Sequence, residues 1–298
     1  MTSTQPATAT GDARAADRAF LQLQKLLPQH ALSRAMHRLA RSTRPVVRTN
    51  LIRLVLHAYP MIDMREAVEP DPYAYASFNA FFTRALRPGA RVIAPGADEL
   101  ASPVDGTVSQ LGVLADGQLL QAKGIRYEAG ALLADEAAAA RYRDGSFACF
   151  YLAPCDYHRI HMPFSGRLEA TRYVPGDLFS VNAATTRVVP GLYARNERVV
   201  CEFATSVGPL ALVMVGALLV GSIETVHAGE INPPRLRRSG IRHIETGIGT
   251  EFAKGAELGR FNMGSTVIVM LGARPVRFAD RLGTGTTVRV GQAYARVQ

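Results

Sequence analysis

The chain has no tryptophan, three cysteines and no hydrophobic run long enough to cross a bilayer. Cys149, Cys155 and Cys201 are odd in number and show no CxxC spacing, which argues against a disulfide framework and against a zinc cluster. The longest apolar run, residues 210–220, is well short of the roughly 20 residues that a membrane-spanning helix needs. Residues 1–17 lack the basic start and apolar stretch of a signal peptide and are typical of a disordered tail. We expect reduced thiols and a protein that is not threaded through a membrane.

Negative charge is scarce in the first part of the chain. Residues 1–68 hold ten Lys or Arg and four Asp or Glu, so this segment supplies +6 of the formal net charge of +9. Apolar stripes with helical spacing run through residues 18–68, with arginines beside them. The pattern suits amphipathic helices on an anionic lipid surface, and it equally suits helices packed on the rest of the protein. No zinc-finger spacing or long Lys/Arg run favours nucleic acid.

The character of the sequence changes at about residue 69, where Pro70, Asp71 and Pro72 mark a linker. Short strand-like runs then alternate with Gly, Pro and Asp turns, and one helical insert covers residues 129–142. We expect an α+β protein in which helices over residues 18–68 precede a mainly antiparallel β-rich domain over residues 69–298. The expected strands are 106–113, 147–152, 167–174, 199–203, 210–215, 266–271 and 286–290.

The pair Gly264 and Ser265 is the most informative local feature. It follows a polar, glycine-rich turn and precedes the run TVIVML, which is rich in β-branched residues and predicts a strand. Ser265 therefore lies at a turn-to-strand junction, where backbone strain can be stored. Gly264 has no side chain to shield its carbonyl from the neighbouring hydroxyl. Taken alone, the pair is better explained by a turn glycine that enters a buried strand, because the sequence Gly-Ser-Thr is common.

Two further motifs accompany this pair. The segment SPVDGTV (residues 102–108) places Asp105 before a strand, and YHRIHMP (residues 157–163) contains His158 and His161. Taken singly, Asp105 suits an Asp-Gly turn and His161 a structural histidine. The two histidines could also ligate a metal, but no third ligand is evident nearby. A carboxylate, a histidine and a serine together can activate the serine as a nucleophile.

With these three motifs, nearly the whole chain resembles the phosphatidylserine decarboxylases, pyruvoyl enzymes that cut themselves at a Gly-Ser bond. The cleavage motif of that family reads LGST, and here Met263 replaces the leucine by an apolar residue of similar volume. The resemblance implies a catalytic domain built as a barrel-like β sandwich, and it suggests a dimer. Further segments follow in family order: residues 78–84, 179–182, 194–198, 215–217 and 220–224.

The resemblance also implies the site and its chemistry. Ser265 would become a pyruvoyl group when serinolysis of the Gly264–Ser265 bond splits the precursor into a β chain (1–264) and an α chain (265–298). Asp105 and His161 would serve this self-cleavage, and His158 would act as the acid in decarboxylation, although the division of work between the histidines stays open. The pyruvoyl would form a Schiff base with phosphatidylserine, giving phosphatidylethanolamine and CO2 in phospholipid biosynthesis. It would be the electron sink, with no metal and no pyridoxal phosphate.

The implied partners are phosphatidylserine and an anionic membrane surface, at the cytoplasmic face of the cell membrane, with no nucleic acid. Each Lys or Arg near such a surface contributes about 1 kcal/mol of attraction, which would explain the basic N-terminal segment. Three alternatives remain: a pyruvoyl decarboxylase of a soluble amino acid, a β-domain carrier of the biotinyl or lipoyl kind, and a serine hydrolase. A carrier would need an exposed lysine turn, and the hydrolase alternative lacks a GxSxG elbow.

Overall fold

The structure is a computed structural model, and it describes residues 21–298 except residues 23, 25, 122–123, 220–221, 232–239 and 273. The tail expected to be disordered, residues 1–17, lies outside the described residues. The helices are α2 (Gln29–Ala40), α3 (Pro45–Ala58), η1 (Met64–Glu66), α4 (Phe78–Phe82), α5 (Ala129–Leu133), α6 (Glu136–Ala139), η3 (Ala140–Tyr142), α7 (Ala183–Thr186) and α8 (Leu192–Arg195). The strands are β1 (Glu99–Ala101), β2 (Gly106–Val113), β3 (Gln118–Leu120), β4 (Arg126–Glu128), β5 (Ser146–Tyr151), β6 (Arg159–His161), β7 (Gly166–Val174), β8 (Arg198–Thr205), β9 (Gly208–Val215), β10 (Ile223–Thr225), β11 (Gly229–Glu230), β12 (Arg242–His243), β13 (Glu251–Phe252), β14 (Glu257–Phe261), β15 (Thr266–Leu271), β16 (Val276–Phe278), β17 (Thr287–Val288) and β18 (Ala293–Val297).

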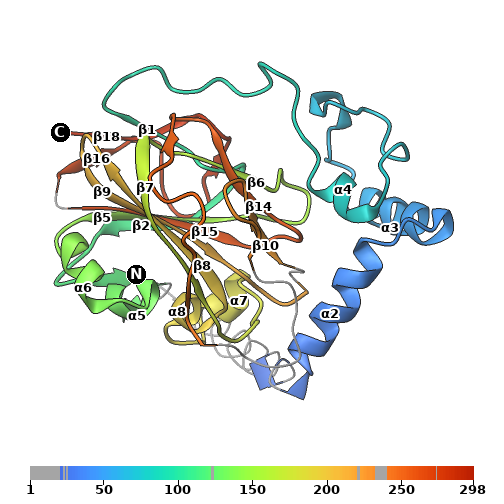
Figure 1. Cartoon of the computed structure of the whole chain (residues 1–298), viewed down its shortest axis with the longest axis horizontal. Coiled ribbons are helices and arrows are strands. Elements are labelled where there is room, and N and C mark those ends of the chain that lie inside the picture. Colours follow the sequence, from blue (N-terminus) through green and yellow to red (C-terminus); the bar gives the residue numbers. More distant parts are fainter. Residues whose placement is uncertain are drawn as a thin grey trace, which may run out of the picture.

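A nine-stranded sheet forms the centre of the molecule (Figure 1). Its order is β12-β7-β8-β9-β15-β5-β2-β17, and β13 pairs with β7 outside this path. Strand β15 is antiparallel to both of its neighbours, with Thr266 opposite Tyr151 of β5 and Val215 of β9. All six residues of β15 are buried, as suits β-branched and long apolar side chains in a strand covered on both faces. The strand therefore has the bounds that its sequence predicts.

Smaller antiparallel sheets complete the β structure, with orders β11-β10-β14-β6, β1-β18-β16 and β3-β4. Across the described residues the sheets form sandwich-like layers and do not close into a barrel. The expected α+β class and its mainly antiparallel sheets are therefore confirmed, as a sandwich-like arrangement. The insert expected at residues 129–142 is helical but interrupted, because Ala134 adopts the left-handed conformation (φ 54°) that ends α5.

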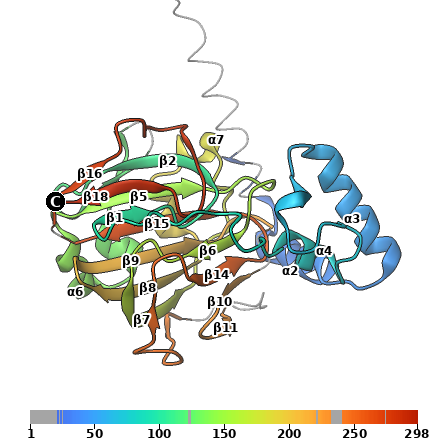
Figure 2. The same ribbon diagram turned by 90° about the horizontal axis from the view of Figure 1, so that it is seen from above.

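Helices α2, α3 and α4 lie together at one end of the molecule, beside β6, β10 and β14 (Figures 1 and 2). Pro45 occupies the first position of α3, where its missing N–H has no partner to lose. The Ser77 hydroxyl caps α4 by accepting a hydrogen bond from the Ala80 amide at 3.1 Å. The three helices enclose a second apolar cluster, separate from the main core. The cluster consists of Ala40, Ile52, Phe78, Phe81 and Phe82.

Of the two interpretations of the apolar stripes, the structure tests packing on the rest of the protein. Met36 and Val55 pack against the second apolar cluster, so one face lies on the protein. Val46 and Leu54 on α3, and Met61 in the turn after it, are 73%, 63% and 66% exposed, and we refer to them as the outer face. None of the described helices is long and apolar enough to span a membrane. The N-terminal helices are thus anchored by an inner face and present a mixed apolar and basic outer face.

Candidate functional site

The Gly264–Ser265 bond lies in the short connection between β14 and β15. Ser265 is fully buried, and its Oγ has no hydrogen-bond partner among the described residues. The Ser265 carbonyl accepts a hydrogen bond from the Leu152 amide at 2.8 Å, which extends the pairing of β15 with β5 by one residue. The expected turn-to-strand junction is confirmed, because β15 begins at Thr266. A buried hydroxyl left without a partner costs about 1–3 kcal/mol, and such groups often have a chemical purpose.

The imidazole of His158 faces this bond. A Cβ atom built on Gly264 would lie only 2.7 Å from His158 Nε2. On the other side of the ring, Nδ1 lies 2.8 Å from the Asp156 carbonyl oxygen, which can only accept, so Nδ1 carries the proton. In the neutral ring Nε2 therefore bears the lone pair, and it has no partner among the described residues. The arrangement presents a base to the Gly264–Ser265 bond.

Burial keeps His158 neutral. Its side chain is fully buried, and the Phe82 ring of α4 packs on it with ring centroids 4.0 Å apart. Burial lowers the pKa of His158 to about 3, against a smaller upward effect of the hydrogen bond to the Asp156 carbonyl. The nearby positive charge of Arg84 lowers this pKa further. The second apolar cluster thus supplies one wall of the site.

His161 has both ring nitrogens occupied. Nδ1 donates to the Gly255 carbonyl at 2.8 Å, so Nε2 is the acceptor for the Tyr157 hydroxyl at 3.1 Å. Burial is the main reason that its pKa lies below the usual value, while the charges of Glu257 and Asp105 act in the opposite direction. In this uncut chain the Nε2 lone pair of His161 is thus engaged by Tyr157.

Asp105 lies on the backbone segment next to His161, because the His161 amide donates to the Pro103 carbonyl at 2.8 Å. Its Oδ1 accepts from Arg91 Nε at 3.0 Å and from the Val290 amide at 2.8 Å, and its Oδ2 also contacts Arg91. Among the hydrogen bonds of the described residues, none joins Asp105 to either histidine. The structure therefore places His158 against Gly264, the neighbour of Ser265, and places Asp105 in an ion pair with Arg91. No hydrogen bond joins His158 Nε2 to Ser265 Oγ.

Sequence reasoning missed Arg91, Tyr157 and Phe82 as neighbours of the site. Tyr157 stands inside the YHRIHMP motif, so its position next to His158 could have indicated it. Phe82 stands inside a segment noted for its family resemblance, but nothing local connects it with a histidine 76 positions later. Arg91 carries no local signal, since it stands among Pro, Gly and Val in an irregular segment.

A chain of polar contacts connects helix α2 with the segment before the cut. Asn262, two residues before Gly264, donates to the Ser222 hydroxyl at 2.7 Å and accepts from Asn79 Nδ2 of α4 at 3.1 Å. Ser222 in turn contacts Glu230, which forms an ion pair with Arg41 of α2 at 2.7 Å. Asn262 and Ser222 are both buried. The connection before the Gly264–Ser265 bond is thereby held to two of the N-terminal helices.

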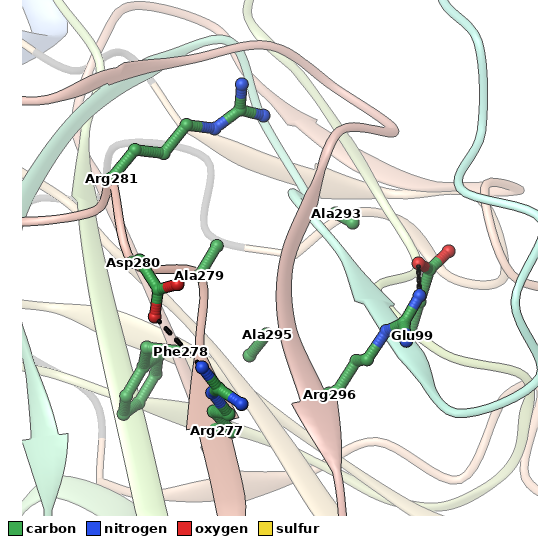
Figure 3. A pocket seen from close by; sticks show the side chains of 9 residues that line it. All are labelled: Glu99, Arg277, Phe278, Ala279, Asp280, Arg281, Ala293, Ala295 and Arg296. Carbon is green, nitrogen blue, oxygen red and sulfur yellow. Dashed lines mark hydrogen bonds and ion pairs between the residues drawn. The ribbon is translucent and has the colours of Figure 1, made fainter.

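Two cavities differ in their relation to these residues. The larger, about 530 Å³, lies at the β1-β18-β16 sheet, and four of its five charged side chains form two pairs, Arg296 with Glu99 at 2.7 Å and Arg277 with Asp280 at 3.4 Å (Figure 3). The smaller, about 160 Å³, is lined by Asp105 among others. None of the expected site residues lines the larger cavity, only Asp105 lines the smaller one, and His158, His161 and Ser265 line neither. No group of three His, Cys, Asp or Glu side chains in the described part of the chain is placed to hold a metal.

Comparison with known proteins gives a consistent result. A family model described as phosphatidylserine decarboxylase matches residues 78–296, and a second model, described as PSD, matches residues 19–60. The phosphatidylserine decarboxylase proenzyme of Xanthomonas euvesicatoria is 51% identical over 278 residues, which cover 93% of this chain and 98% of that protein. The proenzyme of Methylococcus capsulatus is 48% identical over 274 residues, 91% of this chain and 94% of that protein. That of Shewanella halifaxensis is 47% identical over 290 residues, 95% and 99% respectively.

The contact between Gly264 and His158 gives a first prediction. A methyl group at position 264 would lie 2.7 Å from His158 Nε2 and 3.2 Å from the Leu152 carbonyl oxygen, so either the imidazole or the bond must move. If the chain cuts itself at this bond, as the family resemblance implies, we expect Gly264→Ala to slow the cut by about a hundredfold, as misplacement by about 1 Å does in enzymes. Denaturing gels followed over time measure the cleavage. Gly283→Ala is the control, because a Cβ there meets nothing within 4 Å. Equal cleavage rates in the two variants would contradict the prediction.

Proposed function

Because the chain belongs to the phosphatidylserine decarboxylase family, we propose that it converts phosphatidylserine to phosphatidylethanolamine and CO2 after cutting itself at the Gly264–Ser265 bond. One observation carries the proposal: the fully buried, unpartnered Ser265 hydroxyl lies beside a bond that faces the unpartnered Nε2 of His158. A structural turn before a strand requires neither orphan group. A carrier function does not account for this pair of groups. A hydrolase could use a serine and a histidine, but its substrate would have to reach Ser265, which is fully buried.

Removal of CO2 from an amino acid requires an electron sink, which ordinary side chains do not provide. A pyruvoyl group made from Ser265 would supply it, as an electrophilic carbonyl that takes up the electron pair left behind by CO2. The surroundings of Ser265 fit such a group. Besides the Ser265 hydroxyl, the Thr266 Oγ1 and His158 Nε2 are buried and unpartnered among the described residues, so two polar atoms are free to contact it.

The proposed cleavage balances as an internal rearrangement followed by elimination and hydrolysis. Ser265 Oγ attacks the Gly264 carbonyl carbon, the C–N bond breaks, and an ester replaces the amide. Removal of the Ser265 α-proton then expels the Gly264 carboxylate and leaves a dehydroalanine. Water converts the dehydroalanine to the ketone and releases ammonia. Gly264 then ends a chain of residues 1–264, and a chain of residues 265–298 begins at the modified position.

The first step needs a base that takes the Ser265 hydroxyl proton. The contacts favour His158, because its Nε2 is free, unprotonated and directed at Gly264. The family resemblance instead implies His161 with Asp105 for this step. Both ring nitrogens of His161 are engaged, by Tyr157 and by the Gly255 carbonyl. The Asp105 carboxylate is engaged by Arg91 and by the Val290 amide. We propose His158 as the base and Asp105 with Arg91 as a charge pair that fixes the adjacent wall. The two assignments lead to opposite expectations for single variants.

Self-cleavage and decarboxylation both depend on Ser265 in this proposal. Ser265→Ala should stay a single chain and release no CO2 from phosphatidylserine in mixed micelles, because no hydroxyl can attack. Intact mass of both chains and CO2 release are the measurements. Ser206→Ala, in the exposed turn after β8, is the matched control and should behave as the parent protein. A Ser265→Ala protein that still splits at this bond would refute the proposal. Release of CO2 from free serine without lipid would favour the soluble-substrate alternative.

The choice of base is decided by His158→Ala and His161→Ala. If His158 is the base, the cleavage rate of His158→Ala should be at least about a hundredfold lower than that of the parent protein. In the parent protein the pKa of His158 is about 3, so the unprotonated imidazole is lost only as the pH falls through that value. The cleavage rate of the parent should therefore be constant from about pH 5 to pH 8. If His158→Ala is cut normally while His161→Ala and Asp105→Asn are not, the assignment to His161 is correct. A rate that halves near pH 6.5 would exclude a buried His158 as the base.

We also propose that the outer face of the N-terminal helices binds anionic membranes peripherally. Val46, Leu54 and Met61 are exposed there, and Arg44 and Arg53 are exposed on the same helices. Apolar insertion and attraction of cations to anionic headgroups together give reversible binding, where either alone is weak. A lipid substrate gives such a face a purpose, because the headgroup must be reached at the bilayer surface.

The double variant Val46→Glu/Leu54→Glu tests this face while leaving the inner face intact. We expect its affinity for vesicles containing phosphatidylserine to fall at least about tenfold, since two apolar contacts become charges of the lipid's own sign. Flotation with vesicles at increasing salt measures the affinity, and binding should weaken with salt because surface charges are screened beyond about 8 Å. Val92→Glu, at an exposed apolar position away from these helices, is the control. Unchanged binding of the double variant, with self-cleavage intact, would contradict the proposal.

A further inference from the structure

Arg84 is a buried cation without a carboxylate partner among the described residues. It follows helix α4, is 5% exposed, and forms no ion pair with any described side chain. Its Nε has no hydrogen-bond partner, its Nη2 reaches only the Cys155 carbonyl, at 3.4 Å, and its guanidinium carbon lies 5.7 Å from the centroid of the Phe81 ring. A guanidinium that has lost its water in this way is costly unless an anion completes its contacts. An unsatisfied buried cation therefore indicates a missing anionic ligand.

The neighbouring carboxylates already have other donors. Asp105 is held by Arg91 and the Val290 amide. Asp156 accepts from the Ala153 amide at 2.7 Å. Neither carboxylate forms an ion pair with Arg84 among the described residues. Burial has the largest effect on both pKa values; against it, the charge of Asp105 raises the pKa of Arg84, and the charge of Arg84 lowers the pKa of Asp156. The other acidic side chains of the smaller cavity, Asp63 and Glu66, form ion pairs with Arg65, Arg91 and Arg289. Arg84 and Asp156 are thus the lining charges without an ion pair among the described residues.

Arg84 lines the smaller cavity, of about 160 Å³, which extends from Met61 to Asp105 and Gly106. The volume is several times the roughly 30 Å³ that one water molecule occupies, so the cavity can hold part of a ligand. Met61 belongs to the outer face of the N-terminal helices, which we propose to bind membranes. Gly106 begins β2, and β2, β5 and β15 are adjacent strands. With about 4.8 Å between strands, the inner end of the cavity is about 10 Å from the start of β15.

We infer that Arg84 binds the phosphodiester of the lipid headgroup and thereby orients the serine portion toward position 265. The inference rests on the proposed function, which supplies the lipid. The cavity extends from Met61, beside the proposed membrane face, toward the strands next to β15 without reaching Ser265. A phosphodiester lies between the acyl chains and the serine of such a lipid, so it would lie farther from Ser265 than the serine does. A guanidinium matches phosphate oxygens with paired hydrogen bonds.

The headgroup carries a second anion, the carboxylate that is to be lost. A strong contact of Arg84 with that carboxylate would stabilise the substrate more than the transition state, in which its charge disperses into CO2, and would oppose the reaction. A contact with the phosphodiester has no such cost, because that group is unchanged in the product. The phosphodiester is therefore the assignment that agrees with catalysis.

Two measurements test Arg84, one of turnover and one of binding. In the mature enzyme Arg84→Met should raise KM for short-chain phosphatidylserine about tenfold to a hundredfold with kcat little changed, the loss expected for one charge-assisted contact made equally in substrate and transition state. In an uncut Ser265→Ala background, calorimetric titration compares glycerophosphoethanolamine, which has the phosphodiester alone, with free serine, which has the carboxylate alone. Arg84→Met should weaken the first by the same factor and leave the second unchanged. Arg87→Met, at an exposed arginine of the same segment, is the control.

Each other outcome overturns the inference. If Arg84→Met weakens the binding of serine and leaves the affinity for glycerophosphoethanolamine unchanged, Arg84 binds the carboxylate. If neither affinity changes, or if the protein with Arg84 intact binds neither compound, Arg84 is a structural residue. Tighter binding of inorganic phosphate than of glycerophosphoethanolamine would exclude a headgroup site. If Arg84→Met does not fold, Arg84→Gln is read by the same criteria. Absence of CO2 release from phosphatidylserine by the parent would instead refute the proposed function, and the titration would still decide the ligand of Arg84.

Discussion

The pairing of β15 with both β5 and β9 fixes the position on which the rest of the site depends. Because every residue of β15 is paired on both sides, the residue before it has almost no freedom, and the Leu152 amide holds the Ser265 carbonyl in the same register. The imidazole comes to this point from another sheet, since the Phe261 amide of β14 donates to the His158 carbonyl at 3.1 Å. Phe82 of the helical end then covers the ring and excludes water. Two sheets thus place the reacting groups, and a helix sets the polarity around them.

The local sequence pattern was sufficient to predict the bounds of strands whose ends are set by neighbouring residues. The β-branched run after Ser265 has the predicted bounds, as does β2 after Asp105, because residue type and turn chemistry set both ends of these strands. The contacts around the histidines could not be read in this way. Which nitrogen of His158 is free depends on a backbone carbonyl, and the partner of Asp105 is Arg91 because of how an irregular segment crosses the sheet. Family resemblance proposed Asp105, His158, His161 and Ser265 as site residues, but their hydrogen bonds follow from long-range packing.

The N-terminal helices are part of the site and not an attachment to it. Their apolar cluster packs against Met263, the residue before the scissile pair, as well as carrying Phe82. The polar chain through Glu230, Ser222 and Asn262 connects Arg41 of α2 to the same connection. A displacement of these helices would therefore reach the cleavage site through both apolar and polar contacts. The helices that carry the proposed membrane face thus also contact the connection where we propose the chemistry. Residues on the two sides of the boundary expected near residue 69 pack against each other.

The free nitrogen of His158 next to Gly264 also bears on the chemistry after the cut. Cleavage as proposed ends the larger chain in a new carboxylate at Gly264, and the contacts of Asn262 would keep that terminus from leaving. A negative charge would then stand where the uncut chain has a neutral amide, a short distance from Nε2. An opposite charge at such range raises the pKa of a histidine, against the burial that lowers it in the precursor. Breaking the bond would thus convert the same imidazole from a proton acceptor into a proton donor, and maturation would prepare the acid that decarboxylation needs.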